Sequence, residues 1–217
     1  MELSKRNYGY SREEISKNTG ISIGGGLTLY LEKLAEADFI EAYSPVGEER
    51  KETLYRLKDC FCIFYLKYLW GKSQMDEHFW QNSAGTKGVQ IWSGIAFEQI
   101  CLSHLSNIKR ALGISGIVSK ASSYIVRGEK GKRGSQIDMI IERADRNVNL
   151  CEMKFYSTMV SLDKDDSLQI RNKVEVLRKA LKIKGAIFPT LVTTYGLNYN
   201  SYSTIFQRCL TLDDLFD

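Results

Sequence analysis

The segment Gln136–Phe155, QIDMIIERADRNVNLCEMKF, decides the fold of the chain around it. Two apolar runs rich in Ile, Val, Leu and Met flank the polar residues 143–147, and this composition predicts a β-hairpin with a five-residue loop. If the turn is centred on Asp145, residues equally distant from it face each other. Asp138 then lies opposite Glu152, and Lys154 points to the same face as Glu152 because side chains alternate along a strand.

This predicted pair of carboxylates needs a positive partner. Directly opposed residues of a hairpin lie about 5 Å apart, where like charges destabilise the pairing. A divalent metal ion held by Asp138 and Glu152 meets the need, with Lys154 as a further positive charge that positions a water. The alternative is a solvated hairpin face with ordinary charges. Both acids stand inside apolar runs, where charges seldom occur without a partner or a function, and this favours the metal site.

Length and composition set the scale of the fold. The chain has 217 residues, of which 43% are hydrophobic and 11% aromatic, enough for a moderate domain with a small companion. The formal charge is +4 because 30 basic residues are interspersed with 26 acidic ones. This balance permits a polyanionic partner without requiring one.

The cysteines and the N-terminus bear on location. The five cysteines are odd in number, lack Cys-x-x-Cys spacing and lie mostly in apolar surroundings, which predicts free thiols in a reducing compartment. The N-terminus has no apolar signal core, and no window is apolar enough to span a membrane. We therefore expect a cytoplasmic protein without a membrane partner.

Residues 1–58 have the pattern of a winged helix. Ser11-Arg12-Glu13-Glu14 has the form of a capping box, and a second helix with an apolar stripe follows the glycines at 24–26. Two predicted strands, 39–43 and 53–57, complete the pattern. Such a second helix often enters a DNA major groove, but Thr28–Phe39 carries three acids beside one base, a poor surface for phosphate. DNA binding and protein contact therefore stay equally open for this module.

The next segments connect this module to a larger domain. Residues 59–86 form an aromatic helical connector, whose ring spacing indicates core packing rather than base stacking. The larger domain, 87–217, opens with a helix over 89–112. Glu98 lies in the middle of the apolar arc of that helix, so it either adds a third carboxylate to the cluster or reaches water or an ion pair at the edge of the stripe.

The rest of the larger domain predicts a mixed sheet covered by helices, an α/β (α+β) fold. Strand patterns cover 116–127, 186–194 and 204–210, and a helical pattern covers 168–181. The basic loop 128–135 runs directly into the hairpin. Its cations suit phosphate contacts but could equally be solvated; they are Lys130, Lys132 and Arg133.

Together these residues resemble the PD-(D/E)xK nuclease superfamily, with Asp138 as the Asp and Glu152-x-Lys154 as the (D/E)xK. Over almost the whole chain the sequence is also similar to the C-terminal winged-helix and nuclease-like region of a family of archaeal and bacterial AAA+-type ATPases. No ATPase module is present, so the chain looks like the tail of that architecture. The matching motifs are Trp92-x-Gly94-x-x-Phe97-Glu98, Gln136-Ile137-Asp138, Cys151-Glu152-Met153-Lys154-Phe155, Thr193-Thr194-x-Gly196-Leu197 and Leu212-Asp213-Asp214-Leu215-Phe216.

The resemblance implies a restriction-endonuclease-like domain that hydrolyses DNA with Mg²⁺ or Mn²⁺. It assigns metal binding to Asp138 and Glu152 with help from Glu98, and activation of water to Lys154. Gln136 and Gln169 are implied accessory residues. It also implies an ATPase partner and a homodimer that cuts both strands. The alternatives are a catalytically inactive relative that binds DNA or regulates an ATPase, and a module that only contacts proteins.

Overall fold

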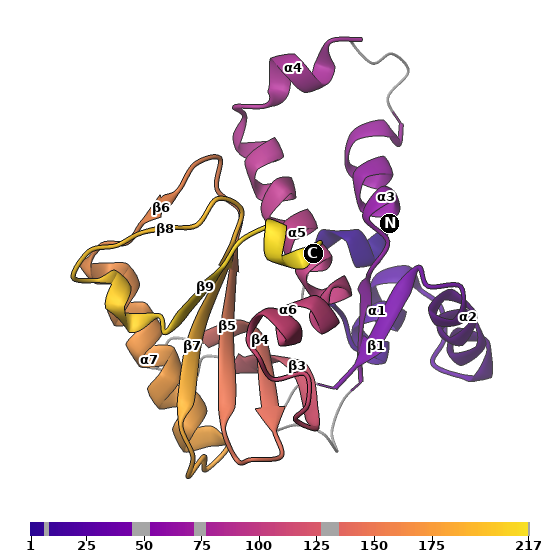
Figure 1. Cartoon of the computed structure of the whole chain (residues 1–217). Coiled ribbons are helices and arrows are strands. Elements are labelled where there is room, and N and C mark those ends of the chain that lie inside the picture. The colour runs from indigo at the N-terminus through magenta and orange to yellow at the C-terminus, as the bar shows by residue number, and fades with distance from the viewer. Residues whose placement is uncertain (7–8, 45–52, 72–76, 127–134, 217) are drawn as a thin grey trace. The chain divides into compact units, whose positions relative to one another are not determined.

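The computed structural model describes residues 1–6, 9–44, 53–71, 77–126 and 135–216 (Figure 1). The chain forms two compact units, residues 1–99 and 100–217, and each is described by itself. Within the described ranges no helix is long and apolar enough to cross a membrane.

The first unit contains the predicted helix-turn-helix and hairpin. Ser11 caps the first helix: its Oγ accepts a hydrogen bond from the backbone N–H of Glu14, and the Glu14 side chain accepts one from the N–H of Ser11, as the predicted capping box requires. A left-handed Gly20 ends this helix. The strands of the hairpin pair antiparallel, Ile40 with Leu57, as predicted, while the tip of the wing lies outside the described residues. The elements are η1 (Glu2–Lys5), α1 (Arg12–Thr19), α2 (Gly25–Glu36), β1 (Ile40–Tyr43) and β2 (Leu54–Leu57).

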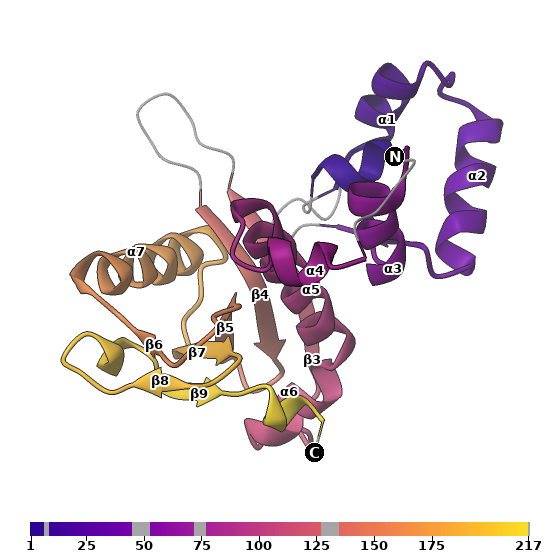
Figure 2. The same cartoon turned by 90° about the horizontal axis from the view of Figure 1, so that it is seen from above.

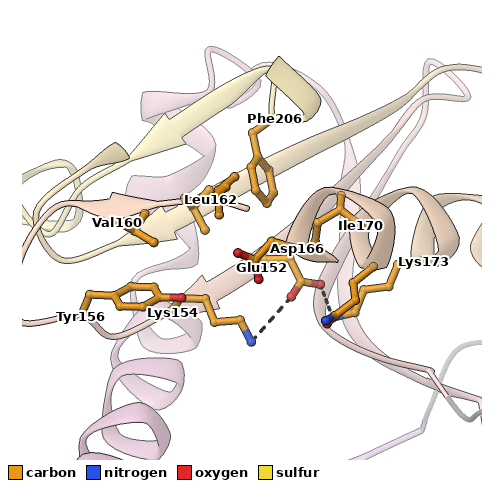
Figure 3. Close-up of a pocket in the computed structure, with 11 residues that line it drawn as sticks. Glu152, Lys154, Tyr156, Val160, Leu162, Asp166, Ile170, Lys173 and Phe206 are labelled. Atoms are coloured by element: carbon orange, nitrogen blue, oxygen red, sulfur yellow. Dashed lines mark hydrogen bonds and ion pairs between the residues drawn. The ribbon is translucent and has the colours of Figure 1, made fainter. Parts of the chain in front are cut away.

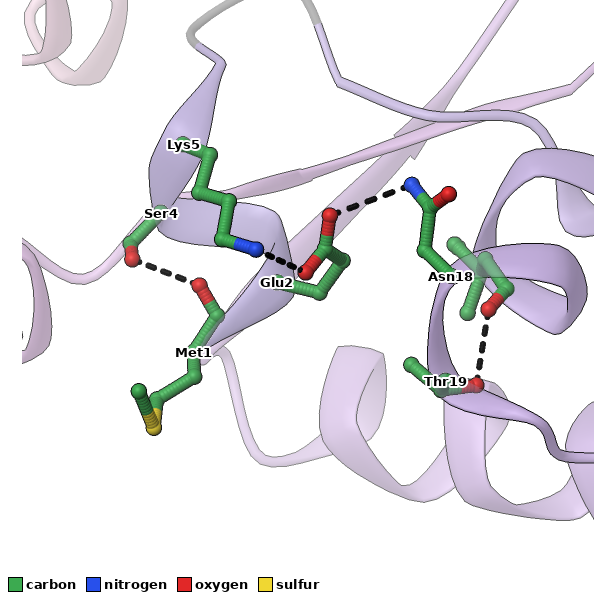
Figure 4. Close-up of polar contacts among 7 residues, drawn as sticks. Met1, Glu2, Ser4, Lys5, Asn18 and Thr19 are labelled. Carbon is green, nitrogen blue, oxygen red and sulfur yellow. Dashed lines mark hydrogen bonds and ion pairs between the residues drawn. The ribbon is translucent and has the colours of Figure 1, made fainter.

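Polar contacts tie the N-terminal turn η1 to α1 (Figure 4). The Glu2 carboxylate accepts hydrogen bonds from Lys5 Nζ at 2.6 Å and from Asn18 Nδ2 at 3.1 Å. Thr19 Oγ1 donates to the backbone carbonyl of Ile15. The bond from Asn18 joins the C-terminal end of α1 to η1, and the bond from Thr19 lies within the last turn of α1.

The predicted connector is aromatic and helical. The Phe64 ring packs against the rings of Tyr68, Trp80 and Trp92 at centroid distances of 5.3–5.8 Å. The rings thus pack against one another, but Phe61, Trp70 and Trp80 stay largely exposed, so the predicted burial of the connector is only partial. The elements here are α3 (Cys60–Phe64), the π-helical turn η2 (Tyr65–Leu69), α4 (Phe79–Ser83) and α5 (Lys87–Ser103).

The second unit is built on a mixed five-stranded sheet of order β3-β4-β5-β7-β9, which confirms the predicted α/β class. The first three strands pair antiparallel, and β5, β7 and β9 run parallel. Helix α7 covers one face of the sheet, and α6 lies on the other side (Figure 2). The elements are α6 (Leu105–Ala111), β3 (Ser119–Val126), β4 (Ser135–Arg143), β5 (Val148–Lys154), β6 (Val160–Ser161), α7 (Lys164–Ala180), β7 (Ile187–Thr193), β8 (Leu197–Asn198), η3 (Ser203–Ile205), β9 (Arg208–Leu210) and η4 (Asp213–Leu215).

The β4–β5 hairpin has the predicted register. Met139 pairs with Cys151 and Glu142 with Val148, so residues equally distant from Asp145 do face each other. Asp138 and Glu152 occupy the next position of this register. Asp145 Oδ1 accepts a hydrogen bond from the N–H of Asn147, and this contact stabilises the turn.

Three predicted elements differ from the structure. The helix expected over 89–112 is broken at His104, whose ring Nδ1 contacts the carbonyl oxygen of Ile100 at 2.8 Å and whose ring lies edge-on to Phe216. Helix α7 starts at Lys164, earlier than the expected 168, because Asp163 and Asp166 form a capping box. In the run 204–210 only the last three residues form a strand.

Gly185 allows the turn of the β4–β5 hairpin to pack against the start of β7. The backbone around it is tied to the turn, since the N–H of Ala186 donates to Asn147 Oδ1 and the N–H of Val148 donates to the carbonyl of Ala186. A Cβ on Gly185 would lie 2.1 Å from the carbonyl oxygen of Arg146, an approach that only glycine permits.

We therefore expect Gly185→Ala to lower the free energy of unfolding by about 1–3 kcal/mol, because backbone must move to admit the methyl group. Urea unfolding followed by circular dichroism measures the change. Gly116→Ala is the matched control, since a Cβ at Gly116 meets no atom within 4 Å. Equal stability of the two variants would contradict the proposed close approach.

Candidate active site

The candidate site is centred on a buried carboxylate. Glu152 lies on the central strand β5 between Cys151 and Met153 and is only 1% exposed. An ionised carboxylate at such a depth is strongly unfavourable without a positive partner and hydrogen bonds. The surrounding residues must therefore supply cationic groups.

Two lysines supply them (Figure 3). Lys173 on α7 donates from Nζ to Glu152 Oε1 at 2.6 Å. Lys154, two residues further along β5, places its Nζ 3.9 Å from Glu152 Oε2. The Lys173 side chain is 17% exposed and that of Lys154 is 50% exposed, so Lys173 is the buried partner and Lys154 faces the solvent.

Asp138 adds a second negative charge beside this cluster. Its Oδ2 accepts a hydrogen bond from the backbone N–H of Met153 at 2.8 Å, which fixes the carboxylate next to β5. The pKa of Glu152 is raised, first by burial and then by the charge of Asp138, while Lys173 and Lys154 partly offset both effects. Two acids and two bases therefore determine the charge of this site jointly.

The cluster opens into a pocket at the C-terminal ends of β5 and β7. Its floor is formed by Glu152, and α7 contributes one side. Tyr156, after β5, is held by its N–H, which donates to Thr194 Oγ1 at 3.0 Å. Apolar residues line the far side, among them Val160 of β6, which pairs in parallel with β8. The pocket is lined by Glu152, Lys154, Tyr156, Val160, Leu162, Asp166, Gln169, Ile170, Lys173, Leu191 and Phe206.

A buried hydroxyl near this pocket has no hydrogen-bond partner among the described residues. Thr193 Oγ1 lies on β7, which pairs in parallel with β5 so that Thr193 is the register partner of Lys154. It shares its face of β7 with Leu191, a pocket residue, because side chains alternate along a strand. Thr193 is itself fully buried and is not among the residues that line the pocket.

The structure brings together some of the predicted site residues but not all of them. The structure brings together Asp138, Glu152 and Lys154, and it places Gln169 in the pocket lining. Gln136 is exposed on β4 and does not line this pocket. Glu98 lies on α5 within the first unit, so its predicted share in the cluster stays a prediction. The cations of the basic loop, Lys130, Lys132 and Arg133, lie outside the described residues.

The carboxylates of the site are possible ligands of a divalent ion. Within the described residues no group of three His, Cys, Asp or Glu side chains is arranged as a metal site. Mg²⁺ is nevertheless commonly bound through one or two carboxylates, with water and substrate phosphates as its other ligands. Asp138 and Glu152 provide this pair of hard oxygen donors, so the residues present fit such an ion.

Sequence reasoning missed Lys173, Asp166 and Tyr156. A signal existed for the first two, because positions 166, 169, 170 and 173 form one helical stripe that includes the predicted apolar Ile170. A polar residue on an inward stripe indicates a buried partner. Tyr156 had no comparable signal, since its position depends on the loop after β5.

Comparisons with known proteins leave the family open. No family model matches the chain. The chain is 26% identical over 133 residues to an uncharacterized protein of Methanocaldococcus jannaschii, MJECL04; the match covers 59% of this chain and 29% of that relative. The chain thus spans less than a third of that protein's length. A solved structure titled "Protein of Unknown Function AF1548" is 19% identical, covers 54% of this chain and 64% of its own, and has a TM-score of 0.37.

The buried acid predicts a specific pH dependence of stability. Because the pKa of Glu152 is raised above its ordinary value of 4.5, folding favours the protonated form. The stability contributed by this group is fully present below pH 4.5 and is lost as the pH rises through the folded-state pKa. We therefore expect wild type to lose stability relative to Glu152→Gln over this range, measured by urea unfolding at a series of pH values. A gain of wild type over the variant would mean that the lysines dominate.

Proposed function

We propose that this chain is a metal-dependent DNA nuclease that hydrolyses phosphodiester bonds at the β5 pocket. The observation that carries the proposal is the convergence of two carboxylates and an exposed ammonium: Asp138 is fixed beside β5, and Lys154 lies 3.9 Å from the buried Glu152. Glu152 and Lys154 line the open pocket, and Asp138 lies beside them on β4 without lining it.

The residues divide the work of hydrolysis. Asp138 and Glu152 would hold a divalent ion, Mg²⁺ or Mn²⁺. When bound, such an ion neutralises phosphate charge and lowers the pKa of water. Lys154, half exposed at the mouth, is placed to contact the phosphate and orient the attacking water. Gln169, which lines the pocket, offers a further hydrogen bond to a ligand there.

The test is cleavage of linear and circular DNA in Mg²⁺ or Mn²⁺. We expect Asp138→Ala and Lys154→Ala each to slow cleavage roughly 100-fold or more, because each removes a charge that acts on the transition state. Matched controls on the exposed face of α7, Glu175→Gln and Lys179→Ala, should cleave as wild type does.

The outcomes separate the proposal from its alternative. Cleavage that survives both Asp138→Ala and Lys154→Ala would indicate a contaminating nuclease and contradict the proposal. Retention of DNA on a gel without cleavage would favour a catalytically inactive domain that binds DNA as the regulatory part of an ATPase partner.

A second function is proposed for the first unit: contact with a protein, such as the ATPase implied by the resemblance. Helix α2 occupies the place of the recognition helix of a winged helix, yet it exposes Leu29, Tyr30 and Leu34. Its exposed charged residues are the acids Glu32 and Glu36 with one base. An apolar surface bordered by acids is typical of protein contact rather than of phosphate binding.

We therefore expect Lys33→Ala on α2 to leave DNA affinity unchanged. If α2 contacted phosphate, loss of this lysine would weaken binding and reduce the slope of log affinity against log salt by about one. Gel retardation of wild type and variant over a series of salt concentrations, in EDTA, makes the measurement. A reduced slope would place α2 on DNA.

A further inference from the structure

Among the described residues Lys173 is the closest cation to the buried carboxylate of the site, and it comes from outside the predicted motif. Its Nζ lies 2.6 Å from Glu152 Oε1, whereas Lys154 Nζ lies 3.9 Å from Oε2 (Figure 3). Lys173 also sits deeper, with 17% of its side chain exposed against 50% for Lys154. The two lysines therefore have different relations to Glu152.

We propose that Lys173 is an internal counter-ion of Glu152, whose ammonium a divalent ion must displace to bind. The inference rests on the proposed function, since it concerns the ion that Asp138 and Glu152 would hold. In this proposal Lys173 sets the affinity of the site for the ion, and Lys154 contacts the phosphate of the substrate.

The need for a counter-ion follows from burial. Glu152 is 1% exposed and adjoins the charge of Asp138, so an ionised carboxylate here depends on a cation at contact distance. Lys173 supplies that cation from α7 and allows β5 to fold around the acid. Strand β5 can therefore fold around the ionised Glu152 without a bound metal ion.

Competition follows from distance and charge. Mg²⁺ binds oxygen at about 2.0–2.1 Å and Lys173 already donates to Oε1, so both cations would share one small carboxylate. They repel each other at such a separation. A lysine can move aside because its four-carbon stem is flexible and its ammonium is readily hydrated, and Lys173 lines the open pocket.

Binding of Mn²⁺ to the full chain, measured by calorimetry and by the ion's electron paramagnetic resonance signal, tests the proposal without any cleavage assay. We expect Lys173→Met to bind Mn²⁺ more tightly, by on the order of tenfold, because the competing charge is gone. Lys179→Met is the matched control on the same helix, since Lys179 is 82% exposed and pairs only loosely with Glu175 at 3.9 Å. It should bind Mn²⁺ as wild type does.

A second measurement guards against misfolding of the variant. Without ion, Lys173→Met should melt at a lower temperature because Glu152 loses its partner, and Mn²⁺ should raise its melting temperature more than that of wild type. The double variant Glu152→Gln with Lys173→Met removes both charges. It should melt above the single variant without ion and gain nothing from Mn²⁺.

Two results would overturn the inference, and they can be told apart. If wild type and Lys179→Met bind Mn²⁺ while Lys173→Met binds it equally or more weakly, Lys173 only supports the fold, and the proposed nuclease function stands. If no protein of the set binds Mn²⁺, the metal site fails, and the metal-dependent function fails together with this inference.

Discussion

The placement of a carboxylate in the central strand constrains the rest of the second unit. Glu152 has apolar neighbours on its strand and is almost fully buried. An ionised carboxylate without a partner at this position would destabilise the fold. Lys173 reaches it from α7, and Asp138 is held by a backbone hydrogen bond at the adjacent position. A sequence under selection for stability alone has little reason to retain such a group, because apolar residues of similar volume often stabilise as well or better. The arrangement is consistent with a group kept for chemistry.

The register of one hairpin makes this arrangement possible. Side chains alternate along a strand, so a shift of one residue between β4 and β5 would turn Asp138 away from Glu152. The close approach of Gly185 to Arg146, together with the bonds from Ala186 and Val148, fixes the turn against the start of β7. A contact at the far end of β5 thus helps to set the position of the acids at its C-terminal end.

Local patterns predicted what depends on neighbours in sequence. The hairpin register follows from two apolar runs and a polar turn around Asp145, and the capping box at Ser11 follows from four consecutive residues. The break at His104 was not predictable in this way, since it involves the Phe216 ring more than a hundred residues away in the chain. Lys173 was missed for a related reason: a single lysine on an amphipathic helix is usually solvated, and only the fold places Glu152 opposite it. Sequence therefore predicted that the two acids lie together but did not predict the base nearest to Glu152.

The topology explains why these groups meet at one end of the sheet. Helix α7 lies in the connection from β5 to the parallel strand β7, so the crossover brings it back over the sheet and turns one stripe toward β5. Beyond the C-terminal ends of β5 and β7 the chain continues into β6 and β8, which pair in parallel with each other, and Val160 of β6 lines the pocket. The acids come from β4 and β5, and the buried lysine comes from the crossover helix. The fold thus brings together residues that the sequence keeps 35 positions apart, from Asp138 to Lys173.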